Sequence, residues 1–140
     1  MQPQIDGIYC PDFSTLITIP LPLASVSAGF PADVADSIDR YIDLNNHLIK
    51  NPTATFLMRV GKTSGRLGGI FPNDILIVDR SHEPVNRNMV VAIINNTLML
   101  KRYRVSEGTT YLKDEHTGGN EKRYFDYEIW GVVLYSIHQL

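Results

Sequence analysis

The sequence has little cysteine and no strong excess of charge of either sign. Its 140 residues include one cysteine, Cys10, which leaves no pair for an internal disulfide and fits a reducing compartment. The formal net charge of -2 gives no overall attraction to nucleic acid or to an anionic membrane. We therefore expect no direct, specific DNA binding, and any connection with DNA would come through a partner protein.

Long apolar runs and metal-ligand spacings are also missing. The longest apolar runs, such as residues 75–78, fall far short of the roughly 20 residues that a membrane-spanning helix needs. The histidines stand far apart and show none of the close spacings of a zinc site. The N-terminus lacks the basic region of a secretory signal. We therefore expect no membrane association, no metal and no cofactor.

What remains is the composition of an ordinary globular domain, with 44% hydrophobic and 20% charged residues. Residues 1–30 differ from the rest of the chain. They are polar and irregular as far as residue 13, and the apolar residues 16–23 are broken by two prolines, which suits an extended arm rather than a central strand. We expect an N-terminal arm over residues 1–30 and one main domain over residues 31–140.

After the arm, the sequence predicts two short helices and then a series of strands. Residues 31–39 can begin a helix with proline in its first turn. Asp43 is suited to cap a second helix over residues 44–50. Further on, a β-branched run predicts a buried strand, and an Asn-Asn pair predicts a tight hairpin. The predicted strands are residues 55–60, 74–79, 89–94, 97–103, 110–113, 124–128 and 129–137. The expected fold class is therefore mostly β.

One glycine-rich stretch, residues 60–70 (VGKTSGRLGGI), contains the residues of greatest chemical interest. Its Gly-Lys-Thr-Ser looks like a phosphate loop. However, a phosphate loop requires another glycine at position 56, where this chain has Phe56, and a helix after the loop. The residues that follow are poor helix formers, so the stretch argues against nucleotide binding.

The same stretch offers Ser64 as a nucleophile. A serine hydroxyl needs a group that takes its proton, and no His-Asp pair is evident. A neutral lysine can do this, since the pKa of a lysine in water, about 10.4, falls when the side chain is buried. Lys101 is a candidate because the strand pattern puts Met99, Lys101 and Tyr103 on one face. The residues alone leave open that Ser64 is an ordinary turn serine and Lys101 a solvated lysine.

Several short stretches, taken in order, carry a resemblance to a known family. They are residues 28–31 (AGFP), 42–45 (IDLN), 51–55 (NPTAT), 68–70 (GGI), 74–80 (DILIVDR), 100–101 (LK) and 130–133 (WGVV). In these stretches the chain resembles the UmuD-like and LexA-like S24 serine/lysine peptidases, from about residue 19 to residue 133. Residues 1–28 show no helix-turn-helix pattern, which favours a UmuD-like polymerase accessory protein over a repressor.

The resemblance implies a site and a set of partners. Ser64 would be the nucleophile, Lys101 the general base, and the bond between Ala28 and Gly29 the site of self-cleavage. The implied fold is that of the LexA and UmuD C-terminal domains. The implied partners are a second copy of the chain, the RecA filament on single-stranded DNA and a UmuC-type translesion DNA polymerase, all in the cytoplasm during the SOS response.

The turn around Ser64 departs from the family pattern. The family usually has Gly-Asp-Ser-Met, whereas this chain has Lys62-Thr63-Ser64-Gly65. Lys62 adds a positive charge that would favour a neutral lysine nearby, or distort the turn, and Gly65 removes an apolar side chain that could exclude water. This departure motivates one alternative, a catalytically impaired scaffold that still dimerises and binds a polymerase. A second alternative, independent of the turn, is the cleavable domain of a phage-type repressor that has lost its DNA-binding half.

Overall fold

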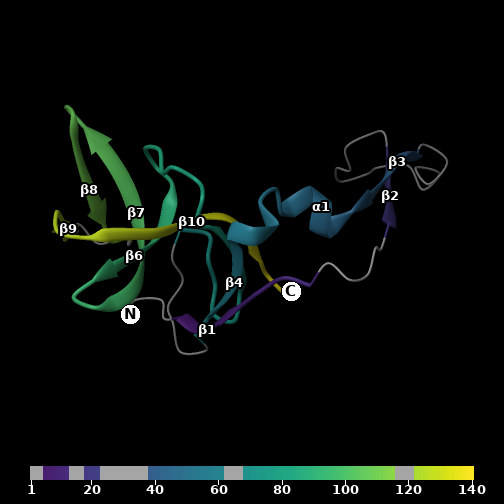
Figure 1. Cartoon of the computed structure of the whole chain (residues 1–140), viewed down its shortest axis with the longest axis horizontal. Coiled ribbons are helices and arrows are strands. Elements are labelled where there is room, and N and C mark those ends of the chain that lie inside the picture. The colour runs from purple at the N-terminus through teal and green to yellow at the C-terminus, as the bar shows by residue number, and fades with distance from the viewer. Residues whose placement is uncertain (1–4, 13–17, 23–37, 62–67, 116–121) are drawn as a thin grey trace. The chain divides into compact units, whose positions relative to one another are not determined.

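Figure 1 shows the computed structural model of the chain. The structure describes residues 5–12, 18–22, 38–61, 68–115 and 122–140. Contacts between the residues divide the chain into two units, Asp12–Lys50 and a larger unit formed by Met1–Pro11 with Asn51–Leu140. The arm boundary at residue 30 stays a prediction.

The larger unit is built on one eight-stranded sheet in which every neighbouring pair of strands is antiparallel. The strand order is β1-β4-β5-β10-β6-β7-β8-β9, so the last long strand lies between β5 and β6 (Figure 1). The strands are β1 (Ile5–Tyr9), β4 (Thr55–Val60), β5 (Ile75–Asp79), β6 (Met89–Ile94), β7 (Thr97–Ser106), β8 (Thr109–Lys113), β9 (Arg123–Tyr124) and β10 (Glu128–Ile137). The predicted mostly-β fold class is confirmed. No helix in the part of the chain that the structure describes is long and apolar enough to cross a bilayer.

Two apolar clusters cover the two faces of the sheet. Successive side chains of a strand point to opposite faces, and in β6 Met89 and Val91 join one cluster while Val90 and Ala92 join the other. The first cluster comprises Met58, Val60, Ile70, Leu76, Val78, Met89, Val91 and Leu100, and the second Val90, Ala92, Ile94, Leu112 and Val132. The central strands are therefore buried on both sides, as the continuous apolar run of β5 predicts.

The hairpin formed by β6 and β7 turns at the predicted asparagine pair. Asn95 and Asn96 have φ angles of 51° and 62°, the left-handed conformation that a two-residue hairpin turn requires. The turn sets a register in which Val90 pairs with Lys101. Strand β7 continues to Ser106, three residues beyond its predicted end, because it also pairs with β8.

Two expectations at the sheet edges are wrong. Residues 5–9 were expected to be irregular, yet they form β1, which pairs with β4 through backbone groups that need no apolar pattern. The strand predicted over residues 124–128 is not continuous. Tyr124 ends the short β9, the chain bends at Asp126, and Glu128 begins β10.

The smaller unit contains a two-stranded antiparallel sheet of β2 (Thr18–Pro22) and β3 (Ile38–Asp43), followed by α1 (Leu44–Leu48). The expected extended conformation is present in β2, where proline is tolerated because a two-stranded sheet leaves one edge of each strand unpaired. The predicted cap of α1 is confirmed, since the Asp43 carboxylate accepts the Asn46 N–H at 3.3 Å.

The helices differ from prediction in length and position. Helix α1 ends at Leu48, two residues before its predicted end. The helix predicted over residues 31–39 is wrong for its last two residues, which belong to β3, and the remainder lies outside the described residues.

Candidate active site

Lys101 lies in the middle of β7 with only 1% of its surface exposed. It is among the largest fully buried side chains of the described chain. Its neighbours on the same face, Met99 and Tyr103, pack against the second apolar cluster. The alternation predicted from the sequence is confirmed, and the alternative of a solvated lysine is wrong.

The Lys101 amine contacts a carboxylate that sequence reasoning missed. Its Nζ donates a hydrogen bond to Asp114 Oδ1 at 2.5 Å, and Asp114 is itself only 8% exposed. Arg102 pairs with Lys113 across the β7–β8 hairpin. One position further from the hairpin turn, Lys101 therefore lies opposite Asp114. The hairpin register was the signal that could have found Asp114. The ring of Tyr124 also lies near the amine, with its centroid 4.8 Å from Nζ.

The glycine-rich stretch connects β4 to β5, and backbone hydrogen bonds join the described residues at the two ends of this connection. The Val60 N–H donates to the Asp74 carbonyl at 2.8 Å, and the Asn73 N–H donates to the Val60 carbonyl at 3.1 Å. Ser64 lies between these ends, outside the described residues, as do Ala28 and Gly29. The roles of these three residues therefore stay predictions.

The returning end of this loop packs beside the strand that carries Lys101. Gly68 has a φ of +53°, and a Cβ built on it would lie 2.6 Å from Arg102 Nη2 and 3.1 Å from Glu115 Cγ. Arg102 is the residue after Lys101, and its Nε donates to Glu115 Oε2 at 2.7 Å. Glycine adopts this conformation without strain, and a side chain here would force the end of the Arg102 side chain to move. Gly68 thus approaches the face of the sheet that carries Met89 and Arg102, whereas Lys101 shares the opposite face with Val90, Met99 and Tyr103.

Asp74 holds the last turn of the loop. Its carboxylate accepts the Phe71 N–H at 2.9 Å and the Ser136 hydroxyl at 2.7 Å, and its Oδ1 lies 2.7 Å from His138 Nδ1. Burial alone would raise the pKa of Asp74, but these hydrogen bonds, with the charge of His138, outweigh burial and lower the pKa below its ordinary 3.8. The loop and the end of β10 are therefore joined through one ionised carboxylate.

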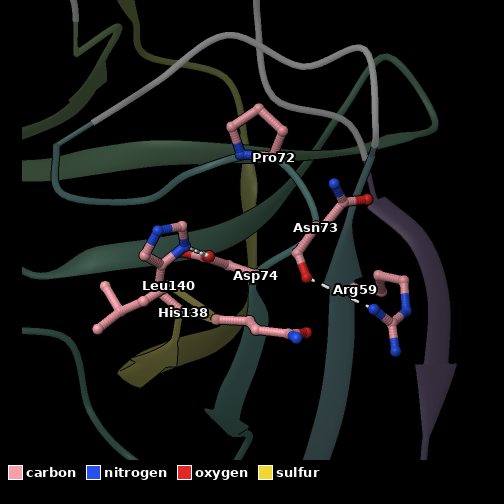
Figure 2. A pocket seen from close by; sticks show the side chains of 7 residues that line it. Arg59, Pro72, Asn73, Asp74, His138 and Leu140 are labelled. Atoms are coloured by element: carbon pink, nitrogen blue, oxygen red, sulfur yellow. Dashed lines mark hydrogen bonds and ion pairs between the residues drawn. The ribbon is translucent and has the colours of Figure 1, made fainter.

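A pocket lies on the solvent side of this carboxylate (Figure 2). Its lining residues are Arg59, Pro72, Asn73, Asp74, His138, Gln139 and Leu140. Figure 2 shows His138 directed at Asp74, and Arg59 hydrogen-bonded to the Asn73 carbonyl at 3.4 Å. Lys101 does not line this pocket. Within the described ranges, no group of three histidine, cysteine or carboxylate side chains is arranged to hold a metal ion.

These observations define a class: a mostly antiparallel β protein with a buried lysine in one strand and a glycine-rich connection between two other strands. The Peptidase S24-like family profile matches residues 20–134. Protein MucA of Salmonella typhimurium is 32% identical over 137 residues, which span 96% of this chain and 94% of MucA. Protein ImpA of Salmonella typhimurium is 36% identical over 75 residues, 54% of this chain and 52% of ImpA. The LexA repressor of Clostridium kluyveri is 31% identical over 101 residues, 72% of this chain and 50% of the repressor.

The chain belongs to the Peptidase S24-like family, and the resemblance predicted from its sequence is confirmed.

Proposed function

We propose that this chain is a UmuD-like SOS mutagenesis protein that cleaves its own backbone between Ala28 and Gly29. Ser64 is the nucleophile and Lys101 the general base. The observation that carries the proposal is the burial of Lys101, at 1% exposure, with its amine fixed by a hydrogen bond to Asp114. A general base must be unprotonated when it takes the serine proton.

The proposed reaction is acyl transfer followed by hydrolysis. Neutral Lys101 Nζ takes the hydroxyl proton as Ser64 Oγ attacks the carbonyl carbon of Ala28. Backbone N–H groups of the loop stabilise the resulting oxyanion. The C–N bond to Gly29 then breaks, and the Lys101 ammonium gives its proton to the Gly29 amine. Lys101 next deprotonates a water, which attacks the ester and releases the Ala28 carboxylate and the Ser64 hydroxyl.

Small residues at the cleaved bond suit this reaction. Neither Ala28 nor Gly29 has side-chain bulk that would block the approach of the hydroxyl, and glycine allows the backbone conformations that a crowded site needs. The cleaved product begins at Gly29. In the proposal it forms a homodimer in the cytoplasm and associates with a UmuC-type translesion DNA polymerase, and a RecA filament on single-stranded DNA stimulates the cut. The match to 94% of MucA supports this reading over that of a repressor.

The test is the mass of the intact protein over time. The purified chain is incubated with RecA, single-stranded DNA and a nucleotide, and separately at alkaline pH without them. We expect a new fragment that begins at Gly29, with no such fragment from Ser64→Ala. A fragment in the Ser64→Ala protein, or an uncut chain under both conditions, would overturn the proposal.

The altered turn around Ser64 favours a second candidate function. Lys62, Thr63 and Gly65 replace residues that the family usually has there, so the chain could be a scaffold that dimerises and binds a polymerase without cutting itself. Retained polymerase binding with no cleavage under either condition distinguishes the scaffold from the peptidase.

A further inference from the structure

We propose that Asp114 holds Lys101 as an ammonium ion and thereby suppresses self-cleavage near neutral pH. This inference rests on the proposed function, in which Lys101 is the general base. Asp114 is a positioning residue, since it acts through Lys101. Its carboxylate is the partner of the Lys101 amine at 2.5 Å, and the two residues are 8% and 1% exposed.

The contact has two opposed consequences. A hydrogen bond between an ammonium and a carboxylate is short and strong, so it fixes the amine in one direction. The same negative charge favours the protonated lysine, and does so more strongly where water is excluded. A general base has to be neutral. The interaction that orients the Lys101 amine therefore also opposes its use as a base.

The other described groups near the amine include one that attracts a cation and one that repels it. The ring face of Tyr124 in β9, at 4.8 Å, attracts a cation, whereas Lys122 Nζ, 4.9 Å from the same ring centroid, is a like charge that opposes it. Tyr103 and Tyr127, like Tyr124, pack against the second apolar cluster. In β6, the residue paired with Lys101 is the apolar Val90. Among these described neighbours, Asp114 supplies the negative charge.

Asp114→Asn tests the proposal because it keeps the side-chain shape and removes the charge. The rate of self-cleavage is measured against pH by intact mass, from about pH 6 to about pH 11. We expect the rise in rate to move to lower pH by about one to three pH units. At a fixed pH near neutrality this corresponds to an increase in rate of about 10- to 1,000-fold. An unchanged profile, or one moved to higher pH, overturns the proposal.

Two further variants separate this effect from a general loss of structure or charge. Glu107→Gln makes the same charge change at the exposed turn of the same β7–β8 hairpin, and we expect it to leave the profile unchanged. Asp114→Glu restores a carboxylate, and we expect a profile close to that of the original protein. If Asp114→Asn does not fold, Asp114→Ser carries the same prediction.

A second measurement does not depend on cleavage. In the Ser64→Ala protein, the protonation of Lys101 is followed by the ¹³C shift of its Cε in an NMR titration, with and without Asp114→Asn. We expect the amine to lose its proton at lower pH when Asp114 is replaced; equal titration would overturn the inference. If the original chain never cleaves, the proposed function fails, and this titration still decides the role of Asp114.

Discussion

His138 Nδ1 lies 2.7 Å from Asp74 Oδ1, and this contact joins the end of β10 to the residue that closes the glycine-rich loop. The same carboxylate accepts the Phe71 N–H inside the loop and the Ser136 hydroxyl from β10. Asp74 is 1% exposed, so its charge is stabilised by these donors rather than by water. The support of the proposed nucleophile loop therefore depends on Asp74 remaining ionised.

Asp74→Asn should weaken the fold in a pH-dependent way. The lowered pKa of Asp74 means that its contribution to stability is present above the ordinary value of 3.8 and is lost as the pH falls through the folded-state pKa. We expect Asp74→Asn to lower the free energy of unfolding by about 1–3 kcal/mol near neutral pH. The difference from the original protein should shrink in acid. Urea unfolding measured near neutral pH and below pH 3.8 checks this, and a difference that is constant with pH would contradict it.

Gly68→Ala should disturb the loop more than Gly69→Ala does. Both glycines have positive φ, so both substitutions introduce backbone strain of about 1–2 kcal/mol. Only at Gly68 would the new Cβ meet a neighbour, Arg102 Nη2 at 2.6 Å, whereas nothing lies within 4 Å of a Cβ at Gly69. We expect Gly68→Ala to reduce both stability and the self-cleavage rate by more than its matched control. Equal effects in urea unfolding and in the cleavage assay would show that the contact with Arg102 is unimportant.

Lys101→Met should abolish self-cleavage and also destabilise the fold. Methionine has a similar length but no amine, so it removes the base and takes the ammonium away from the buried Asp114. Breaking a buried ion pair from one side typically costs about 3–5 kcal/mol. We expect the double variant Lys101→Met/Asp114→Asn to recover part of that loss without recovering cleavage. Thermal and urea unfolding of both single variants and the double variant measure the coupling, and simple additivity would argue against a direct interaction.

Restoring the family pattern around the nucleophile should speed the reaction. The variant Lys62→Gly/Thr63→Asp/Gly65→Met places Gly-Asp-Ser-Met around Ser64 and supplies an apolar side chain that excludes water from the dyad. We expect at least about tenfold faster self-cleavage, a change typical of improved general-base positioning. Adding Ser64→Ala to this variant is the control and should stop the reaction. A restored variant that cuts while the original chain does not would favour the scaffold function for the natural sequence.

The sequence predicted those parts of the fold that local patterns determine. The alternation around Lys101, the Asn95-Asn96 turn and the Asp43 cap each depend on a few consecutive residues, and the structure confirms all three. The sequence did not predict β1, because this edge strand forms through backbone hydrogen bonds with β4 and shows no apolar pattern of its own. Asp114 was missed because its contact with Lys101 depends on the register between two strands.

The pH dependence of self-cleavage tests the Ser64/Lys101 dyad most directly. The rate is measured by intact mass between about pH 7 and about pH 10, without RecA, with Ser64→Ala as the control. Because Lys101 must be neutral to take the serine proton, the rate should rise about tenfold per pH unit until the amine is deprotonated, and the control should stay uncut. A rate that is flat across this range, or cleavage that persists in Ser64→Ala, would contradict the proposed mechanism.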